Sequence, residues 1–292
     1  MCVTVKMPGS CGELVQGQID GVNFHITCPV NIFSQVTAYF STSTRKITCS
    51  PKKKKALRAT EKILAYLNGK GTSIGLRFFS RIPVGKGMAS STADIAGSCF
   101  AVANLLGKNL TFSKIASIAS EIEPTDGIIH KGIVCFDHIR GKLIENLGYP
   151  PPMKVLVIDP GGKIDTLVFN KRKDLRILHR VNRKIIEEAY FLVKEGMKKK
   201  DPELIGAGAT ISSVCNQIIL YKPELTRIIS LSKKLGALGV NVAHSGSVIG
   251  ILLPSDFSRF NQLEQRIKKE CGSHLKFYRT AITGGGPRIE DE

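Results

Sequence analysis

The sequence lacks the features that mark exported or membrane-spanning proteins. Its first ten residues, MCVTVKMPGS, contain no basic segment followed by a long apolar one, so they predict no signal peptide. The most apolar candidate for a membrane span, residues 236–254, is interrupted by Asn241, His244, Ser245 and Ser247. It favours two buried strands around a turn over a spanning helix. We therefore expect no membrane partner.

The cysteines show no metal-binding or disulfide pattern. There are eight of them, scattered along the chain, with no CxxC pair and no zinc spacing. A chain of 292 residues is also long enough to bury a core without a disulfide framework. Cysteines of this kind are typical of reduced thiols that pack as small apolar groups. Together with the missing signal peptide, they predict a cytoplasmic location.

Acidic residues are scarce. The chain has 24 Asp and Glu against 42 Lys and Arg, which gives a net charge of +18. The excess is concentrated in residues 163–200, with twelve basic and five acidic residues, and in the run from Lys52 to Lys55. A nucleic-acid-binding protein is one interpretation of this charge. Because no nucleic-acid motif is present, we favour solvated basic helix faces and expect no nucleic-acid partner.

Strand and helix patterns are mixed along the whole chain. Strand patterns occupy residues 24–40, 73–82, 133–137, 153–159, 238–244, 247–253 and 275–283. Helix patterns occupy residues 53–68, 90–106, 112–122, 172–195, 202–219, 223–235 and 256–270. The three prolines at 150–152 predict a boundary between domains of residues 1–150 and 151–292. The chain is thus expected to form a two-lobed α+β protein.

A glycine-rich segment between a predicted strand and a predicted helix is the strongest functional signal. Its sequence, PVGKGMASSTA, spans residues 83–93. Glycine allows tight turns and close approach to a ligand, and the free N–H groups at a helix start favour an anion. A serine hydroxyl there can also ligate Mg²⁺. The residues proposed to hold a triphosphate are Pro83, Gly85, Lys86, Gly87, Met88, Ala89, Ser90, Ser91 and Thr92.

This segment does not match the two common phosphate-binding motifs. A Walker loop needs Lys and then Ser or Thr directly after its last Gly, whereas Lys86 precedes Gly87. A dinucleotide fingerprint needs a third Gly where Ser90 stands. A glycine-rich turn followed by an ordinary serine helix cap would also explain these residue types. Glycine and serine content alone leaves the two interpretations balanced.

Carboxylates gather in a second segment, EIEPTDG, at residues 121–127. It places Glu121, Glu123 and Asp126 within six positions. Pro124 ends the preceding helix, so these acids are expected on a turn. A solvated acidic turn and a catalytic acid cluster are both possible. His130 and His138, farther along, have no metal-ligand spacing, and we expect them to be packed or exposed histidines.

The pattern Pro-x-x-x-Gly-x-x-Ser-Ser-x-Ala at residues 83–93 resembles the second motif of the GHMP kinase superfamily. MPGSCGELVQG, residues 7–17, resembles the first motif, and AHSGSVIGI, residues 243–251, resembles the third. The three segments stand in the family's order. The resemblance implies an N-terminal α+β domain with a left-handed βαβ crossover, which breaks the usual right-handed rule, and a ferredoxin-like C-terminal domain.

The resemblance also implies roles for individual residues. ATP would be the phosphoryl donor, with Mg²⁺ held by Ser91 and by Glu123 or Glu121. Asp126 would deprotonate or orient the attacking hydroxyl group, and Ser91 and Asp126 would form the catalytic centre. Glu13 could meet an amino group of the substrate. The implied substrate site consists of Ser10, Cys11, Gly12, Glu13, Asp126, Ser245 and Gly246.

The run EPTDGIIHKGIVCFDHIRG, residues 123–141, narrows the resemblance. With PGSCGELVQG and GKGMASSTADIAG it is similar to the L-threonine kinases that make threonine phosphate for cobalamin assembly. This substrate assignment comes from the resemblance alone. A GHMP kinase for another small alcohol such as homoserine, a GHMP-fold protein that binds without catalysis, and a basic nucleic-acid-binding protein are the alternatives. The sequence carries no signal for an oligomeric state.

Overall fold

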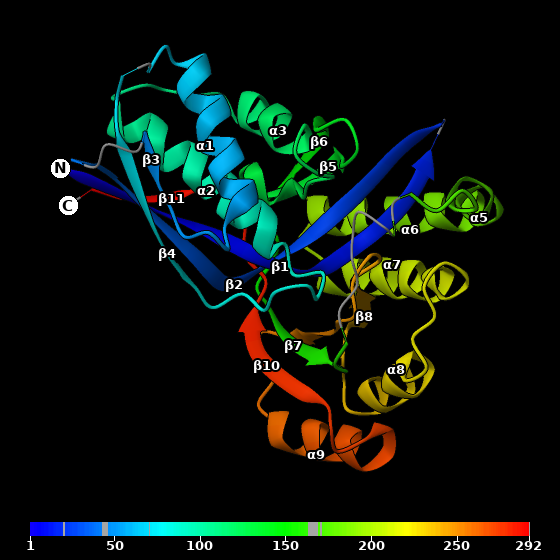
Figure 1. Ribbon diagram of the computed structural model, residues 1–292. Helices are drawn as coiled ribbons and strands as arrows, with labels where there is room; N and C mark the ends of the chain where they lie inside the picture. The colour runs from blue at the N-terminus through cyan, green and yellow to red at the C-terminus, as the bar shows by residue number, and fades with distance from the viewer. Residues whose placement is uncertain (20, 43–45, 70, 163–168, 170, 292) are drawn as a thin grey trace.

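The computed structural model describes residues 1–291 apart from residues 20, 43–45, 70, 163–168 and 170. Its strands join in one sheet, drawn in Figure 1. The strands are β1 (Cys2–Ile19), β2 (Val22–Phe40), β3 (Ile47–Thr48), β4 (Ile74–Ser80), β5 (Ile133–Asp137), β6 (Lys142–Gly148), β7 (Met153–Asp159), β8 (Gly239–Val242), β9 (Ile249–Pro254), β10 (Lys276–Ala281) and β11 (Arg288–Asp291). The helices are α1 (Lys54–Tyr66), α2 (Ser90–Leu105), α3 (Phe112–Ser120), α5 (Leu175–Val181), α6 (Arg183–Lys199), α7 (Pro202–Cys215), α8 (Leu225–Lys234) and α9 (Phe260–Cys271), with single 3-10 turns η1 (Gly127–Ile129) and η2 (Asn216–Ile218).

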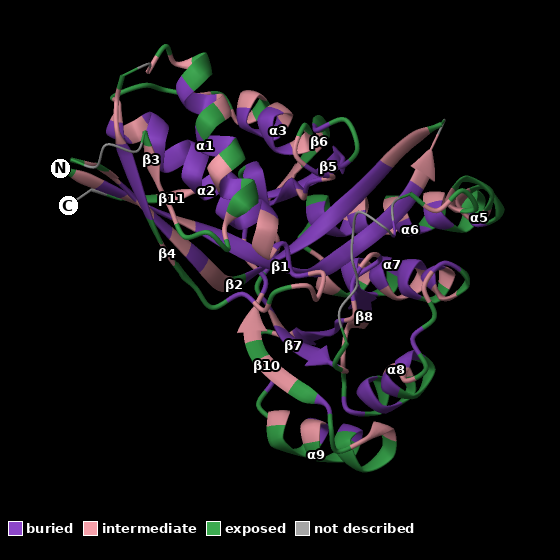
Figure 2. Cartoon of the chain, in the orientation of Figure 1, coloured by how far each residue is buried: buried purple, intermediate pink, exposed green. Residues whose placement is uncertain are grey.

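Two long antiparallel strands, β1 and β2, form the spine of the molecule. They pair along almost their whole length, and the register shifts between Pro8 and Gly9, between Ser10 and Glu13, and between Glu13 and Val15. Such bulges bend a strand and re-aim its side chains. Figure 2 shows that the middle of both strands is buried. The bulged part of β1 therefore lies inside the protein and can position polar groups of a site.

The first lobe packs α1, α2 and α3 together against one face of this sheet (Figure 1). Helix α2 lies against β1 and β2 and is buried along most of its length. Small residues make this close packing possible: a Cβ atom on Gly97 would lie 2.7 Å from Cγ2 of Val36 on β2. Strands β3 and β4 run parallel and are joined through α1, which makes a βαβ crossover. Helix α2, which follows β4, therefore lies over the spine formed by β1 and β2.

The second lobe has the ferredoxin-like arrangement that the family resemblance implies. Its strands lie in the order β10-β7-β9-β8, and every neighbouring pair is antiparallel. Helices connect β7 to β8 and β9 to β10, which gives the βαββαβ chain order of that fold. A separate apolar cluster, which includes Leu156, Ile228 and Ile251, fills the space under α8 and α9. The expected α+β fold class is confirmed.

The two lobes share elements. β11 returns from the C-terminal end of the chain to pair with β1, and β8 pairs with β1 at Glu13 and Val242. Helices α6 and α7 also pack on β1. Residues from both ends of the sequence therefore meet around the bulged part of β1. The domain boundary at residues 150–152 stays a prediction.

Most predicted elements are present, with three differences. The helix expected at 172–195 is two helices, α5 and α6, separated at Asn182, whose Nδ2 donates to the carbonyl of Cys215 at 2.8 Å. Pro8, Gly9 and Ser10, for which no strand was predicted, lie within β1. Strands β1, β3, β6 and β11 were not predicted. Part of the basic segment 163–200 lies outside the described residues.

Three expectations from the sequence, on residues 236–254, on membrane-spanning helices and on disulfides, can be compared with the structure. Residues 236–254 contain β8 and β9 around a turn, as predicted. No described helix is long and apolar enough to cross a membrane. The cysteines form no disulfide among the described residues, and Cys11, Cys28, Cys99 and Cys135 are buried while the other four are partly exposed.

Candidate active site

The first turn of α2 lacks the side-chain cap that a helix start usually has. Its capping residue is Ala89, whose backbone is left-handed with φ of 58°, and no side chain accepts a hydrogen bond there. Gly85 and Gly87 in the preceding loop also have positive φ, at 74° and 79°. The amides of Ser90 and Ser91 in the first turn thus have no partner within the helix. The ordinary serine cap is excluded, and the helix start suits an anion.

The three sequence motifs meet at this loop. From β1, the amide of Ser10 donates to the carbonyl of Met88 at 3.0 Å, and the amide of Gly12 donates to the carbonyl of Gly87 at 3.2 Å. From the turn after β8, the amide of Ser247 donates to the carbonyl of Lys86 at 3.0 Å. Carbonyl groups of the loop therefore accept hydrogen bonds both from β1 and from the turn after β8, and these bonds fix the path of the loop.

Close contacts between the two segments explain why glycine occupies positions 87 and 246. A Cβ atom on Gly246 would lie 2.4 Å from both the Cα of Gly87 and the carbonyl oxygen of Lys86. A Cβ atom on Gly87 would lie 2.4 Å from the Cβ of Ala243. No real Cβ atom makes such contacts with backbone, so neither position accepts a side chain without displacing the loop. Gly246 thus packs directly against the backbone of the loop.

One carboxylate reaches the first turn of α2 from the acidic turn. Ser91 Oγ donates to Glu123, and the second carboxylate oxygen of Glu123 accepts from Lys55 Nζ at 2.5 Å. Glu123 is buried, whereas Glu121 is exposed and pairs with Lys62 on α1 at 2.7 Å. The structure therefore brings Glu123 to Ser91 and leaves Glu121 outside this group.

The second carboxylate of the acidic turn, that of Asp126, contacts the next residue of α2, Thr92. Thr92 Oγ1 donates to Asp126 Oδ2 at 3.0 Å and accepts from the Asp126 amide at 3.3 Å. Burial raises the pKa of Asp126 to about 7, with the negative charges of Glu13 and Glu123 adding to the rise and the Thr92 hydrogen bond opposing it. A carboxyl group with this pKa is half ionised near neutral pH and can accept a proton.

Glu13 faces the same space from the bulged part of β1. Its Oε2 accepts from the backbone amide of His244 at 2.9 Å and from His244 Nδ1 at 3.1 Å. His244 Nδ1 also lies 3.2 Å from the carbonyl of Val242, another acceptor, so this nitrogen carries the proton. Ser212 Oγ, which accepts from the Gln16 amide, lies 3.1 Å from the other ring nitrogen. Glu13 is thus held at one oxygen by a buried chain of hydrogen bonds.

Several basic residues near the loop are already paired with acids. Lys86 Nζ donates to Asp159 Oδ1 and to the Gly162 carbonyl, both at 2.7 Å. Lys53 pairs with Asp94, which also accepts from Ser34 on β2. Lys86, which the sequence assigned to phosphate, therefore ties the loop to the end of β7.

The sequence did not single out Lys53, Lys55, Lys222, His25 or His244. A run of lysines before a helix gives no sign that two of them turn toward buried acids on α2 and the acidic turn. Lys222 is the only buried lysine or arginine in the described part of the chain, and its Nζ donates to the Gly246 carbonyl at 2.9 Å. Its burial lowers its pKa to about 8, partly offset by Glu13 and Glu224. The basic run and the isolated Lys222 look ordinary in a chain with 42 basic residues.

Three further residues named in the sequence analysis, Cys11, His130 and His138, lie in the interior of the protein. Cys11 is fully buried, its carbonyl accepts from Asn241 Nδ2, and its thiol packs beside Gly250. His130 and His138 are buried among aromatic rings, as expected for packed histidines. Gly285, near the C-terminal end, hydrogen bonds to Gly132 and packs there.

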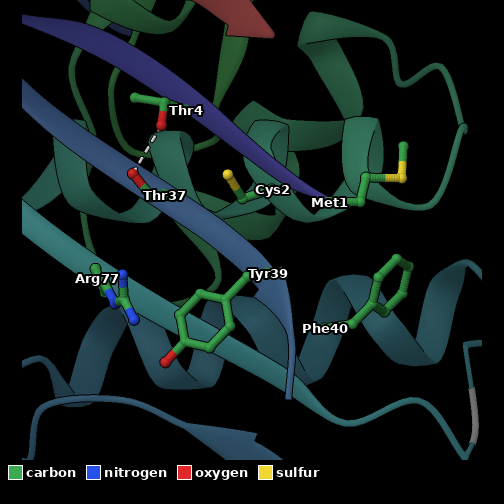
Figure 3. Close-up of a pocket in the computed structure, with 7 residues that line it drawn as sticks. All are labelled: Met1, Cys2, Thr4, Thr37, Tyr39, Phe40 and Arg77. Carbon is green, nitrogen blue, oxygen red and sulfur yellow. Dashed lines mark hydrogen bonds between the residues drawn. The ribbon is translucent and has the colours of Figure 1, made fainter. Parts of the chain in front are cut away.

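A pocket elsewhere on the molecule contains none of these residues. It lies at the end of the sheet near the start of β1 and is lined by Met1, Cys2, Thr4, Thr37, Tyr39, Phe40 and Arg77 (Figure 3). Eight residues of extended strand separate Cys2 from Ser10, which is about 26 Å at a strand's rise per residue. The pocket is therefore remote from the start of α2.

The arrangement around α2 has two chemical halves. Free amides, a serine hydroxyl and the Lys55–Glu123 pair suit a phosphate group with a bound cation. Asp126 and Glu13 lie alongside and can act on a polar group of a second molecule. Together they can position an acceptor next to a phosphoryl donor.

Comparison with known proteins gives the same assignment in sequence and in fold. Residues 54–134 match the profile described as GHMP kinases N terminal domain, and residues 193–273 match GHMP kinases C terminal. The chain is 35% identical over 255 residues to an L-threonine kinase of Salmonella typhimurium, covering 85% of this chain and 82% of that protein. It is 32% identical over 251 residues to an L-threonine kinase of Citrobacter freundii, covering 85% of each.

Solved structures share the fold at low sequence identity. A homoserine kinase from Cytophaga hutchinsonii superposes with a TM-score of 0.73 at 17% identity, covering 99% of this chain and 97% of that one. The mevalonate kinase of Methanococcus jannaschii superposes with a TM-score of 0.71 at 19% identity, covering 96% and 98%. These likenesses establish the architecture.

Proposed function

This chain belongs to the GHMP kinase family, and from that premise we propose that it transfers the γ-phosphoryl group of ATP to the hydroxyl group of L-threonine. One observation carries the proposal: Glu123 and Asp126, from one acidic turn, contact adjacent residues on the uncapped first turn of α2. A phosphate site and a candidate proton acceptor are thereby side by side. The two relatives that are at least 32% identical to this chain support the substrate.

The amides of the first turn of α2 bind the triphosphate. Gly85, Gly87 and the left-handed Ala89 shape the loop so that these amides point to one place. Lys55 lies beside Glu123 and adds positive charge near the phosphates. Phosphoryl transfer needs little covalent help from the protein, so positioning and charge account for most of the catalysis.

Ser91 and Glu123 fit a magnesium ion. Both offer oxygen atoms, which Mg²⁺ prefers, and both lie at the start of α2, where phosphate oxygens would complete the coordination. When bound, the ion offsets negative charge on the phosphate oxygens. Glu121 is assigned no part in this site, because its carboxylate is exposed and, unlike that of Glu123, has no hydrogen bond to Ser91 in the described structure.

Asp126 acts on the substrate hydroxyl. As the hydroxyl oxygen forms its bond to the γ-phosphorus, the bond from that phosphorus to the oxygen bridging it to the β-phosphate breaks, and ADP leaves. The hydroxyl proton passes to Asp126, which Thr92 holds in place. A pKa of about 7 lets Asp126 accept that proton at neutral pH. The finer parts of the proposal are that O-phospho-L-threonine serves cobalamin assembly and that the protein works in the cytoplasm.

The test is ADP release by the purified protein with MgATP and a panel of L-threonine, L-serine, L-homoserine and mevalonate. Asp126→Ala and Ser91→Ala are measured beside the wild type. We expect L-threonine to give the highest kcat/KM and both variants to lose it. Glu121→Ala is the matched control, since it changes a carboxylate of the same turn that faces away.

Each outcome separates one part of the proposal. If L-homoserine is preferred and the variants still fail, the mechanism stands and the substrate is wrong. If no hydroxyl compound stimulates ADP release, the kinase proposal is wrong, and the alternatives are ligand binding without catalysis or nucleic-acid binding. Nucleic-acid binding would then be recognised by its steep dependence on salt concentration.

A further inference from the structure

We propose that His25 is a specificity residue, and that with Glu13 and Asp126 it forms a three-acceptor site for the ammonium group of an amino-acid substrate. The inference rests on the proposed function and deepens it. The three side chains come from β1, β2 and the acidic turn. One ligand-type atom from each lies within 4.8 Å of the other two. Because Asp126 also contacts the start of α2, this site adjoins the place of phosphoryl transfer.

His25 has an unused acceptor. The ring is buried, its Nε2 has no hydrogen-bond partner in the described structure, and burial lowers its pKa well below the usual value, with His138 and His244 adding to the effect. The ring is therefore neutral, and in the tautomer that carries its proton on Nδ1 the unpartnered Nε2 offers a lone pair. A buried polar atom without a partner costs free energy, so it points to a ligand that supplies a hydrogen.

The two carboxylates also have oxygens to spare. His244 binds one oxygen of Glu13, and Thr92 binds one oxygen of Asp126. Neither carboxylate pairs with a lysine or arginine in the part of the chain that the structure describes. One buried and one partly buried carboxylate beside a neutral imidazole form a negative site that a cation would stabilise.

An ammonium group matches this site in its number of hydrogen bonds. It has three N–H groups for three acceptors, arranged at tetrahedral angles. Acceptors about 2.9 Å from its nitrogen would be separated by about 4.7 Å, and the three atoms of the site lie within 4.8 Å of one another. A transition metal would hold its ligands at about 2.1 Å, and the metal-binding arm of the experiment distinguishes it from an ammonium group. Glu13 also spends one oxygen on His244, which leaves fewer ligands for a metal.

The site would select among alcohols by their amino group. In L-threonine the amino and hydroxyl groups are on adjacent carbons, so Asp126 can contact both. A buried site that hydrogen bonds a polar group rejects an analogue lacking it by about 10⁴-fold, because its own acceptors are left without partners. We therefore expect 3-hydroxybutyrate, which is L-threonine without the amine, to bind poorly.

The experiment measures steady-state kinetics and calorimetric binding of L-threonine and 3-hydroxybutyrate to the wild type and to H25F, H25Q and H138F. Phenylalanine keeps the ring that stacks on His138, whose centroid lies 4.9 Å away, but removes the lone pair. We expect H25F to raise the KM and Kd for L-threonine by about 10-fold, a loss typical of one hydrogen bond to a charged group, without changing the KM for ATP. H25Q keeps an acceptor and should recover part of the affinity.

His138→Phe is the matched control, because it changes the neighbouring buried histidine and should alter KM by less than about 2-fold. Equal effects of H25F and H138F would overturn the inference, as would equal binding of L-threonine and 3-hydroxybutyrate to the wild type. So would Zn²⁺ or Mn²⁺ that binds without nucleotide and is lost in H25F, while L-threonine binding is kept. Calorimetry without ATP tests the site even if no phosphoryl transfer occurs, so the two proposals fail separately.

Discussion

The two ends of the active site differ in how their acidic groups are paired. At the phosphate end Glu123 pairs with Lys55, Asp94 with Lys53 and Asp159 with Lys86. At the substrate end Glu13 accepts from the amide and Nδ1 of His244, Asp126 accepts from Thr92, and no lysine or arginine pairs with either carboxylate in the described structure. The same chain, with its large excess of basic residues, thus pairs one set of acids with lysines and leaves another set without such partners among the described residues.

This difference has a physical consequence. A buried carboxylate without a cation costs free energy, which shows itself as the raised pKa of Asp126. A paired carboxylate does not carry that cost. Under the two proposals, the paired end would receive anionic phosphate with a metal ion, and the unpaired end would receive a cation. The predictions below test each end in turn.

The largest effect is expected at the substrate end, from Asp126→Asn. The amide cannot accept the hydroxyl proton, so kcat should fall by about 10³-fold, within the range typical of general-base catalysis. The measurement is ADP release at saturating L-threonine and MgATP, with circular dichroism to show that the variant folds. A decrease below 10-fold would mean that Asp126 does not take the proton.

The same variant should be more stable than the wild type at pH 8. The pKa of Asp126 is about 7 in the folded protein against 3.8 for an unperturbed group, so the folded state binds the proton more tightly. Stability from this group is greatest at low pH and is lost as the pH rises from about 4 to about 7. Because the amide introduced by Asp126→Asn does not ionise, the variant does not lose this stability as the pH rises. We expect the melting temperature at pH 8 to rise by at least about 2 °C, and a decrease would contradict the charge assignment.

At the phosphate end, Glu123→Gln is expected to have the next largest effect. Losing a metal ligand beside Ser91 should lower kcat/KM by about 10²-fold and raise the Mg²⁺ concentration needed for half-maximal rate. Glu121→Gln is the matched control, since its exposed pair with Lys62 contributes little and the variant should stay within about 2-fold. Equal effects of the two substitutions would mean that the metal ligand is misassigned.

Local patterns in the sequence predicted the helix start and the acidic turn well. Residues 83–93 follow β4 and open α2, and Ser91 and Asp126 lie where the motifs placed them. The ferredoxin-like lobe also followed from the family resemblance. These features depend on short stretches of chain whose residue types are restricted by glycine geometry and by helix starts.

Features that depend on long-range packing were not predicted. Strand β1 was missed because Pro8, Gly9 and Gly12 interrupt its pattern, and only pairing with β2 and β8 makes it a strand. The pairing of Lys86 with Asp159 joins residues 73 positions apart. His25 looked like one more residue of an apolar strand. Nothing local in the sequence reports that its ring faces two carboxylates from other elements.

A fourth prediction concerns the pH dependence of catalysis at the substrate end. As the pH rises through about 7, Asp126 loses its proton, so kcat/KM for L-threonine should be about 10-fold higher at pH 8 than at pH 6. A bound ammonium group favours the ionised carboxylate, so the profile of kcat should lie at lower pH than that of kcat/KM. Coincident profiles, measured with ATP saturating, would argue that no cation binds beside Asp126.

The smallest effect is expected from the paired charge at the phosphate end, in Lys55→Met. Lys55 is about half exposed and its charge is shared with Glu123, so its loss should raise the KM for MgATP by about 5-fold and leave the KM for L-threonine unchanged. Lys54→Met removes the same charge from the preceding position of α1, and it should change neither constant by more than about 2-fold. Because a general effect of net charge would act through both lysines alike, a difference between them isolates the contact with Glu123. A rise in the KM for L-threonine in Lys55→Met would instead show that the two ends of the site share their charges.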